Sequence, residues 1–139
     1  MFTINIWAVL VAAVANFIIG FLFHGPLFGK VWMRLANIHP TGNEKFKDMI
    51  PQMVKNLAVN IIFAYVLACV YLFATTSPLI GGSGALNGMM CAFWIWLGFV
   101  VTTTSIEVIW MGRSYKLWLF EAASSLVCCL AMGAIIGAW

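Results

Sequence analysis

Two glutamates are the side chains in this sequence best able to take part in chemistry. Glu107 and Glu121 each lie one to two turns inside a long apolar segment. A carboxylate surrounded by apolar residues is costly unless it is paired with a cation, protonated or hydrated. Each glutamate is therefore a candidate for holding a proton, a solute or a neighbouring cation.

Hydroxyl side chains share a helical face with each glutamate, because they lie three and four positions away along the chain. These residues are Thr103, Thr104, Ser124 and Ser125. We expect the two polar stripes to meet each other or to line a hydrated crevice. His24, at the end of another apolar segment, is a candidate to join them.

A structural role explains the same residues without any activity. Glu107 could pair with Arg113, and Glu121 with Lys116, at the level of the lipid headgroups. Such pairs would fix the short turn between two helices, and the hydroxyl groups could bond back to their own helices. We favour this structural interpretation over a solute or proton pathway, and a pathway over catalysis.

Other chemistries find little support in the motifs. The chain has no nucleophile motif, and its Gly81–Gly84 run lacks the Lys-Ser/Thr pair of a phosphate-binding loop. His24, His39 and the glutamates show no metal-ligand spacing. The four cysteines lie in apolar segments, where cysteine behaves as a small apolar residue. We expect no catalytic residues, no metal and no cofactor.

Composition decides which elements must carry these residues. Of the 139 residues, 64% are hydrophobic and 8% charged, and the mean hydropathy is +1.03. Soluble domains average about 45–50% apolar and about 25% charged residues, and a small soluble fold cannot bury so much apolar surface. The sequence therefore predicts an all-α integral membrane protein, with residues 1–139 forming a single transmembrane domain.

Four apolar segments are long enough to cross a bilayer of about 30 Å. The predicted spans are Ile4–Phe23, Leu57–Ala74, Leu86–Met111 and Leu117–Trp139. We expect no cleaved signal peptide, because the start lacks basic residues and the first apolar run continues past a small-residue site.

The segment between the first two spans has its own local signals. Gly25-Pro26 is expected to end or bend the first helix. The pattern of Leu27–Leu35 predicts a short amphipathic helix in the membrane interface. Thr41 and Glu44 resemble a capping box that would start the second long helix, which then bends at Pro51.

The basic residues predict the orientation of the chain. All seven lie in the loop between spans one and two or in the turn between spans three and four: Lys30, Arg34, Lys45, Lys47, Lys55, Arg113 and Lys116. Lys and Arg are enriched in cytoplasmic loops. We therefore expect a multi-pass protein of the cell inner (plasma) membrane with both termini outside, and no nucleic-acid partner.

Small residues recur at four-residue spacing on two spans. Gly84 and Gly88 do so on the third span, and Gly133 and Gly137 on the fourth. Such faces let helices approach closely. They could pack within one bundle, which we favour, or form the contact of a homo-oligomer. The expected partners are membrane lipids and this candidate homo-oligomer, while a protein partner stays unknown.

The stretch Gly25–Met33, which reads GPLFGKVWM, resembles the signature of a bacterial family of small four-helix membrane proteins. This family is known as domain of unknown function seventeen-sixty-one. The C-terminal Met132–Trp139 is similar to the tail of the same family, so the resemblance spans nearly the whole chain. It implies a four-helix membrane architecture and supplies no activity.

Three functions compete at this point. The first is an oligomeric channel or transporter-like protein with a cytoplasm-facing polar crevice, which requires hydrated carboxylates. The second is a structural or accessory membrane protein that binds lipids or a protein partner, which requires the carboxylates to be paired. A membrane enzyme is third, because it needs a reactive constellation that the sequence does not offer.

Overall fold

The computed structural model describes residues 3–43, 45–78 and 82–139. Every element in these ranges is a helix, as the sequence predicted: α1 (Ile6–Leu22), the π-helical η1 (Phe23–Leu27), α2 (Gly29–Leu35), α3 (Phe46–Thr75), α4 (Ala85–Ile95), the π-helical η2 (Trp96–Val101), α5 (Thr102–Met111) and α6 (Tyr115–Ala138).

Four continuous helical stretches are long and apolar enough to cross a membrane. They are Ile6–Leu27, Phe46–Thr75, Ala85–Met111 and Tyr115–Ala138. Each contains most of one predicted span, so the four-helix prediction is confirmed. The second stretch begins before the span predicted from Leu57, as expected of a helix that starts in the polar sequence on its N-terminal side.

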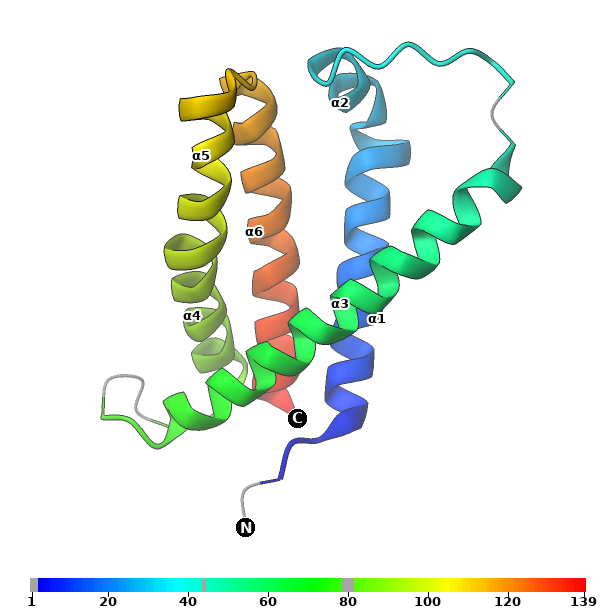
Figure 1. The fold of residues 1–139 in the computed structure, drawn as a ribbon. Helices are drawn as coiled ribbons and strands as arrows, with labels where there is room; N and C mark the ends of the chain where they lie inside the picture. Colours follow the sequence, from blue (N-terminus) through cyan, green and yellow to red (C-terminus); the bar gives the residue numbers. More distant parts are fainter. Residues whose placement is uncertain (1–2, 44, 79–81) are drawn as a thin grey trace.

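The helices are arranged around α6. This helix packs against α1 on one side and α4 on the other, while α3 crosses over them diagonally (Figure 1). Both termini and the end of α3 lie at one end of the bundle. The α2 segment, the start of α3 and the α5–α6 turn lie at or toward the other end, and together they carry the basic residues (Figure 1).

Small residues form the core where α1, α3 and α6 meet. Ala12 and Ala13 of α1 and Ala64 of α3 are completely buried beside Met132 of α6. Because these side chains are short, the helix backbones approach closely. The buried residues of α3 all lie in its C-terminal half, between Ala64 and Tyr71. Its N-terminal half therefore leans away from the bundle (Figure 1).

The Gly25-Pro26 pair does not end the first helix where expected. The helix continues through both residues as the π-helical turn η1 and stops at Phe28, whose φ is −127°. Proline lacks an N–H group, and a π-helical turn shifts the hydrogen-bond register around it. A short helix, α2, then follows as predicted, although its position in the membrane interface stays a prediction.

The predicted capping box does not start α3. The helix begins at Phe46 with Lys45 as its N-cap residue, and no side chain caps it. Thr41 is therefore too far from the helix to be its N-cap, and Glu44 lies outside the described residues. Pro51 lies within α3, in the second turn, as the sequence led us to expect.

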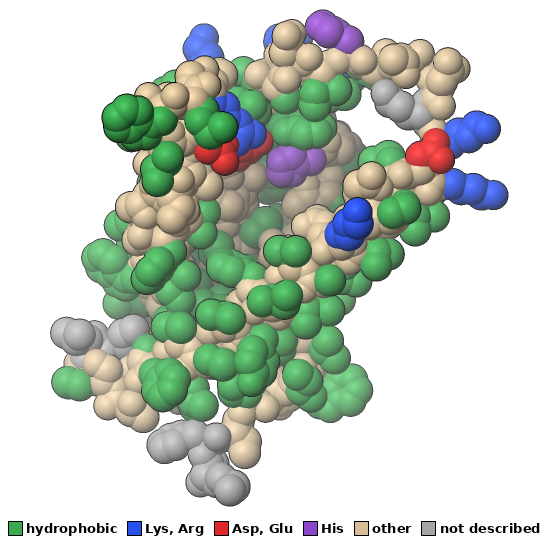
Figure 2. Space-filling model, viewed as in Figure 1, with side chains coloured by type: hydrophobic (Ala, Val, Ile, Leu, Met, Phe, Trp, Pro, Cys, Tyr) green, Lys and Arg blue, Asp and Glu red, His purple; other side chains and the backbone are tan. Residues whose placement is uncertain are grey.

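Charged residues gather at one end of the molecule. On the face shown in Figure 2, Lys, Arg, Asp and Glu side chains lie near α2, the start of α3 and the α5–α6 turn. The rest of that face is mostly hydrophobic, as expected of a surface that contacts lipid.

Candidate functional site

The turn between α5 and α6 places a cation beside the two glutamates. Gly112 ends α5 in the left-handed conformation, with a φ of 67°. The next backbone N–H, that of Arg113, donates to the carbonyl oxygen of Glu107 at 3.2 Å. A glycine in the left-handed conformation commonly ends a helix in this way, and here the closing hydrogen bond spans one residue more than the 6→1 bond of a Schellman motif. The turn thus directs Arg113 back toward α5 and α6.

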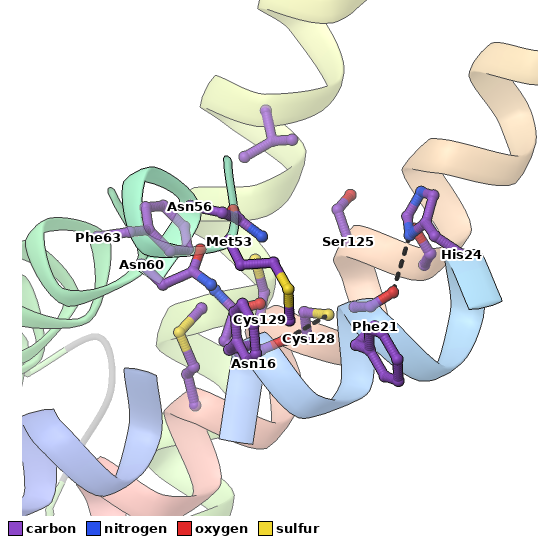
Figure 3. Close-up of a pocket in the computed structure, with 15 residues that line it drawn as sticks. Asn16, Phe21, His24, Met53, Asn56, Asn60, Phe63, Ser125, Cys128 and Cys129 are labelled. Atoms are coloured by element: carbon purple, nitrogen blue, oxygen red, sulfur yellow. Dashed lines mark hydrogen bonds between the residues drawn. The ribbon is translucent and has the colours of Figure 1, made fainter. Parts of the chain in front are cut away.

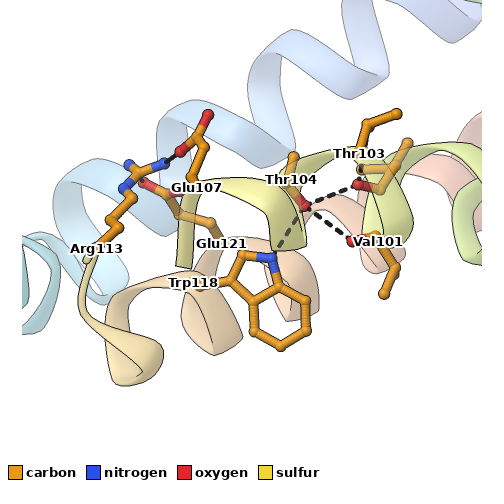
Figure 4. Close-up of polar contacts among 8 residues, drawn as sticks. Val101, Thr103, Thr104, Glu107, Arg113, Trp118 and Glu121 are labelled. Atoms are coloured by element: carbon orange, nitrogen blue, oxygen red, sulfur yellow. Dashed lines mark hydrogen bonds and ion pairs between the residues drawn. The ribbon is translucent and has the colours of Figure 1, made fainter. Parts of the chain in front are cut away.

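Arg113 bridges both carboxylates. One guanidinium nitrogen pairs with Oε2 of Glu107, and Nη2 lies 2.9 Å from Oε1 of Glu121 (Figure 4). The three side chains are 30–40% exposed. Arginine can serve two carboxylates because its guanidinium presents five N–H donors in a planar fork. We call these three residues the arginine bridge.

The arginine bridge contains the expected pair of Glu107 with Arg113, but Glu121 pairs with the same arginine and not with Lys116 as expected. Lys116, the expected partner of Glu121, is exposed and makes no ion pair with any described residue. One arginine replaces the two separate ion pairs, because the Gly112 turn brings it within reach of both helices.

The threonines near Glu107 do not extend this polar group into the bundle. Thr103 is exposed and donates its hydroxyl hydrogen to the carbonyl of Phe99, within its own helix. Thr104 bonds the carbonyl of Val100 and accepts a hydrogen bond of 3.0 Å from the indole N–H of Trp118 (Figure 4). Thr104 thus ties α5 to α6.

The remaining predicted residues lie at a different place. His24, Ser124 and Ser125 line a cavity of about 380 Å³ between α1, α3 and α6, and none of the residues of the arginine bridge lines it. The single polar crevice expected from the sequence is therefore divided into a bridge at the α5–α6 turn and a separate cavity.

Both cavity serines bond back to their own helix, as the structural interpretation allowed. Ser124 donates to the carbonyl of Glu121 at 3.1 Å, and Ser125 to that of Ala122 at 2.9 Å. The Ser125 oxygen also accepts a 2.9 Å hydrogen bond from the indole N–H of Trp96. Trp96 begins η2, so this bond joins the third span to α6.

His24 is held in place from several sides. Its Nδ1 lies 2.9 Å from the carbonyl oxygen of Gly20. A carbonyl only accepts hydrogen bonds, so Nδ1 carries the hydrogen, and in a neutral imidazole Nε2 is then an acceptor. The ring meets Trp32 and Phe120 edge to face, with centroids 5.2 and 5.9 Å away.

Three asparagines are the cavity residues that the sequence analysis missed. Asn16 comes from α1, and Asn56 and Asn60 come from α3. Figure 3 shows the amides of Asn56 and Asn60 extending from α3 toward the side where Asn16 lies. The available signal was amide side chains on apolar helices at four-residue spacing, which places Asn56 and Asn60 on one face.

These amides are unpaired. Within the described part of the chain, no hydrogen bond involves the side chain of Asn16, Asn56 or Asn60. Apolar groups of Phe17, Phe63 and other side chains form the rest of the wall. The cavity thus combines free hydrogen-bonding groups with apolar surface.

The four candidate packing glycines lie at the contact between α4 and α6. A Cβ atom added to Gly88 or Gly133 would overlap the backbone of the facing glycine, and one added to Gly137 would overlap Gly84. Both glycine faces are therefore used within one chain. A homo-oligomer is not supported by these faces.

The four cysteines are free thiols, and Cys128 and Cys129 line the cavity. Among residues 3–43, 45–78 and 82–139, no three His, Cys, Asp or Glu side chains gather closely enough to hold a metal ion.

Four apolar helices in one bundle, with the basic loops gathered at one end, define the class of this molecule: a multi-pass α-helical membrane protein. Its family model is described as protein of unknown function (DUF1761), and it matches residues 7–137, so the chain belongs to that family. This confirms the resemblance drawn from Gly25–Met33. No curated protein and no solved structure matches the chain.

Proposed function

We propose that this protein is a transporter-like membrane protein that binds a polar group in the cavity between α1, α3 and α6. The unpaired amides of Asn16, Asn56 and Asn60 are the observation that carries the proposal. Asn56 is exposed, and Asn16 and Asn60 are half-buried, so the surroundings can reach each amide. Water or a ligand in the cavity can therefore supply the hydrogen bonds that the protein does not.

The size of the cavity supports the same role. Its volume of about 380 Å³ lies within the range of about 300–1,000 Å³ typical of small-molecule sites. Besides His24 and two cysteines, the polar groups of the wall are amides and hydroxyls, which bind ligands well but are poor nucleophiles and poor acid–base groups. The proposal is therefore binding or transport without catalysis, and it needs no cofactor.

The orientation of the chain predicts the compartment to which the cavity opens. It is lined by the C-terminal half of α1 and by the N-terminal half of α3, so it lies toward the end that carries the basic loops. Under the rule that basic loops face the cytoplasm, the cavity opens to the cytoplasm of an inner-membrane protein whose termini are outside.

The arginine bridge has a structural role in this proposal. Each carboxylate already has a cation partner, so neither needs a solute or a proton to satisfy its charge. We propose that the bridge fixes the α5–α6 turn.

Cysteine reactivity tests whether the cavity is hydrated. In a variant with all four native cysteines changed to alanine, we compare Asn60→Cys with Ile62→Cys. Residue 60 lines the cavity, whereas Ile62, two positions away on the same helix, is 64% exposed on the outer surface. A thiol reacts as the thiolate, which requires water.

We expect a charged, membrane-impermeant thiol reagent to modify Asn60→Cys at least about tenfold faster than Ile62→Cys in proteoliposomes, because only position 60 has access to water. Equal, slow modification of both would show that the cavity is dry, and the transport proposal would be wrong.

The alternative is an accessory membrane protein that binds lipids or a protein partner without transport. The arginine bridge favours it, because that function requires paired carboxylates. Slow labelling of Asn60→Cys is the result that this alternative predicts.

A further inference from the structure

The cavity has an open side toward the bilayer. All buried residues of α3 lie between Ala64 and Tyr71, so its N-terminal half, residues 46–63, contributes none. That half nevertheless lines the cavity through Met53, Asn56, Asn60 and Phe63. The cavity therefore lies between the well-packed α1 and a helix half that leans away from it (Figure 1).

A second, shallower hollow continues the cavity toward the basic end. It has a volume of about 520 Å³ and is lined by Lys45, Asp48 and Gln52, and it shares Met53 and Asn56 with the cavity. Gln52, Asn56 and Asn60 follow one another at four-residue spacing, so they form one polar stripe along α3. A ligand can follow this stripe from the membrane surface to the middle of the bundle.

The chemistry of the walls selects an uncharged polar group. Among the residues that the structure describes, no Asp, Glu, Lys or Arg lines the cavity. Amides offer both donors and acceptors, and an imidazole that donates through Nδ1, as His24 does to Gly20, can accept through Nε2. Hydroxyl groups match such a surface because each is a donor and an acceptor. At the outer hollow, Lys45 and Asp48 have opposite signs, so neither charge is favoured there.

The apolar part of the cavity wall indicates that the ligand also has an aliphatic chain. Phe17, Phe21, Phe63, Met53 and Met132 alternate with the polar groups around the cavity. A lipid that enters from the bilayer keeps its hydrocarbon chain in apolar contact against such side chains. A free polyol would gain nothing from this surface.

We propose that the ligand is a neutral amphiphile: a lipid with an uncharged, hydroxylated headgroup. It enters from the bilayer between α1 and the N-terminal half of α3. Its headgroup binds the unpaired amides, and its chain stays against the apolar wall and the open side. This inference rests on the proposed function of the cavity and names its substrate class.

Native mass spectrometry of the full-length protein in detergent tests the inference with three probes. Monooleoylglycerol has both an uncharged hydroxylated headgroup and an aliphatic chain. Glycerol has only the hydroxyl groups, and oleate has the aliphatic chain with a negatively charged headgroup. We expect an adduct with monooleoylglycerol, none with glycerol, and at least about tenfold weaker binding of oleate, because the uncharged cavity cannot pair a carboxylate.

The matched variants change one amide each. Asn60→Leu keeps the side-chain size and removes the hydrogen-bonding groups inside the cavity. Asn87→Leu makes the same change on α4, where the amide bonds only the carbonyl of Ser83, outside the cavity. We expect Asn60→Leu to weaken monooleoylglycerol binding about tenfold, equivalent to one or two hydrogen bonds, and Asn87→Leu to leave it unchanged.

Three results would overturn the inference. If glycerol binds as tightly as monooleoylglycerol, the site takes a water-soluble solute. If oleate binds as tightly, the headgroup is not selected. Absence of any adduct, with Asn60→Cys rapidly labelled, rejects the amphiphile while the hydrated, transporter-like cavity stands. Slow labelling of Asn60→Cys rejects the proposed function itself.

Discussion

At the scale of single residues, the arginine bridge shows how two carboxylates are accommodated near the end of the bundle. Arg113 reaches Glu107 and Glu121 together because the left-handed Gly112 turns the chain back on itself. A lysine at the same place would present a compact point charge and could not fork between two carboxylates.

The first prediction concerns this cation. Arg113→Met should lower the free energy of unfolding by about 1–2 kcal/mol, a value discounted because the three side chains are about one third exposed and partly screened by solvent. Arg113→Lys should recover at most about half of the loss. Thermal unfolding in detergent measures both.

Lys116→Met is the control for the loss of a positive charge, because Lys116 makes no ion pair with a described residue. It should change stability by less than about 0.5 kcal/mol. If Lys116→Met destabilises the protein as much as Arg113→Met does, the net charge at this end determines the stability and the arginine bridge does not contribute to it.

The second prediction concerns an unpaired amide. Asn60→Leu should change the free energy of unfolding of the ligand-free protein by less than about 0.5 kcal/mol, because no described protein group bonds this amide and water in the cavity can satisfy it. Asn87→Leu, which loses a hydrogen bond to Ser83, should not stabilise the protein. A loss of stability in Asn60→Leu would mean that the amide has a structural partner.

At the scale of the elements, glycine decides how closely α4 and α6 approach. Gly88 and Gly133 face each other so closely that neither can carry a Cβ atom, and a Cβ atom on Gly137 would overlap the carbonyl of Gly84. This contact makes the third and fourth spans a tight antiparallel pair. The π-helical η2 then turns Trp96 toward Ser125, which adds a hydrogen bond to the same pair.

The third prediction compares two glycine-to-alanine changes on these spans. Gly133→Ala should destabilise the bundle by about 2–3 kcal/mol, because its Cβ atom would overlap the Gly88 carbonyl and lie 2.7 Å from the Cβ of Ala92. Gly98→Ala should be neutral or stabilising by up to about 1 kcal/mol, since nothing lies within 4 Å and alanine favours the helix.

Unfolding with a denaturing detergent, followed by circular dichroism, checks the pair. Similar stability of both variants would mean that α4 and α6 are further apart than described. Because the glycines are used within one chain, loss of stability should not depend on protein concentration, as it would in an oligomer.

At the scale of the whole molecule, four spans give the bundle two chemically different ends. The termini and the α3–α4 connection are at one end, and both basic segments are at the other (Figure 1). The cavity lies nearer the basic end, so the orientation of the chain decides which compartment supplies its ligand.

The fourth prediction tests this orientation in intact cells. In the cysteine-free background, an impermeant thiol reagent should label Ser83→Cys, and should label Asn43→Cys only after the membrane is permeabilised, because the basic loop faces the cytoplasm. Serine 83 is chosen because Gly82 has a φ of 114°, which disfavours a cysteine there. The reverse labelling pattern would place both termini in the cytoplasm.

The sequence by itself determined that this chain is helical and how many times it can cross a bilayer. Runs of apolar residues long enough for a span are local features, because each helix satisfies its own backbone hydrogen bonds. The family was also identifiable from a local motif, Gly25–Met33. The positions of Glu107, Glu121 and the glycines at close spacing were likewise visible, since helical periodicity alone places residues on faces.

Only the tertiary structure decided which faces meet. It showed that Arg113 pairs with both glutamates. This pairing could not be predicted from the sequence, because it depends on the direction in which the Gly112 turn leads the chain. It separated Ser124, Ser125 and His24 from the glutamates, because α3 crosses at an angle that no local pattern encodes. The cavity amides come from α1 and α3, far apart in sequence, so their convergence depends on helix packing and could not be read from either helix alone.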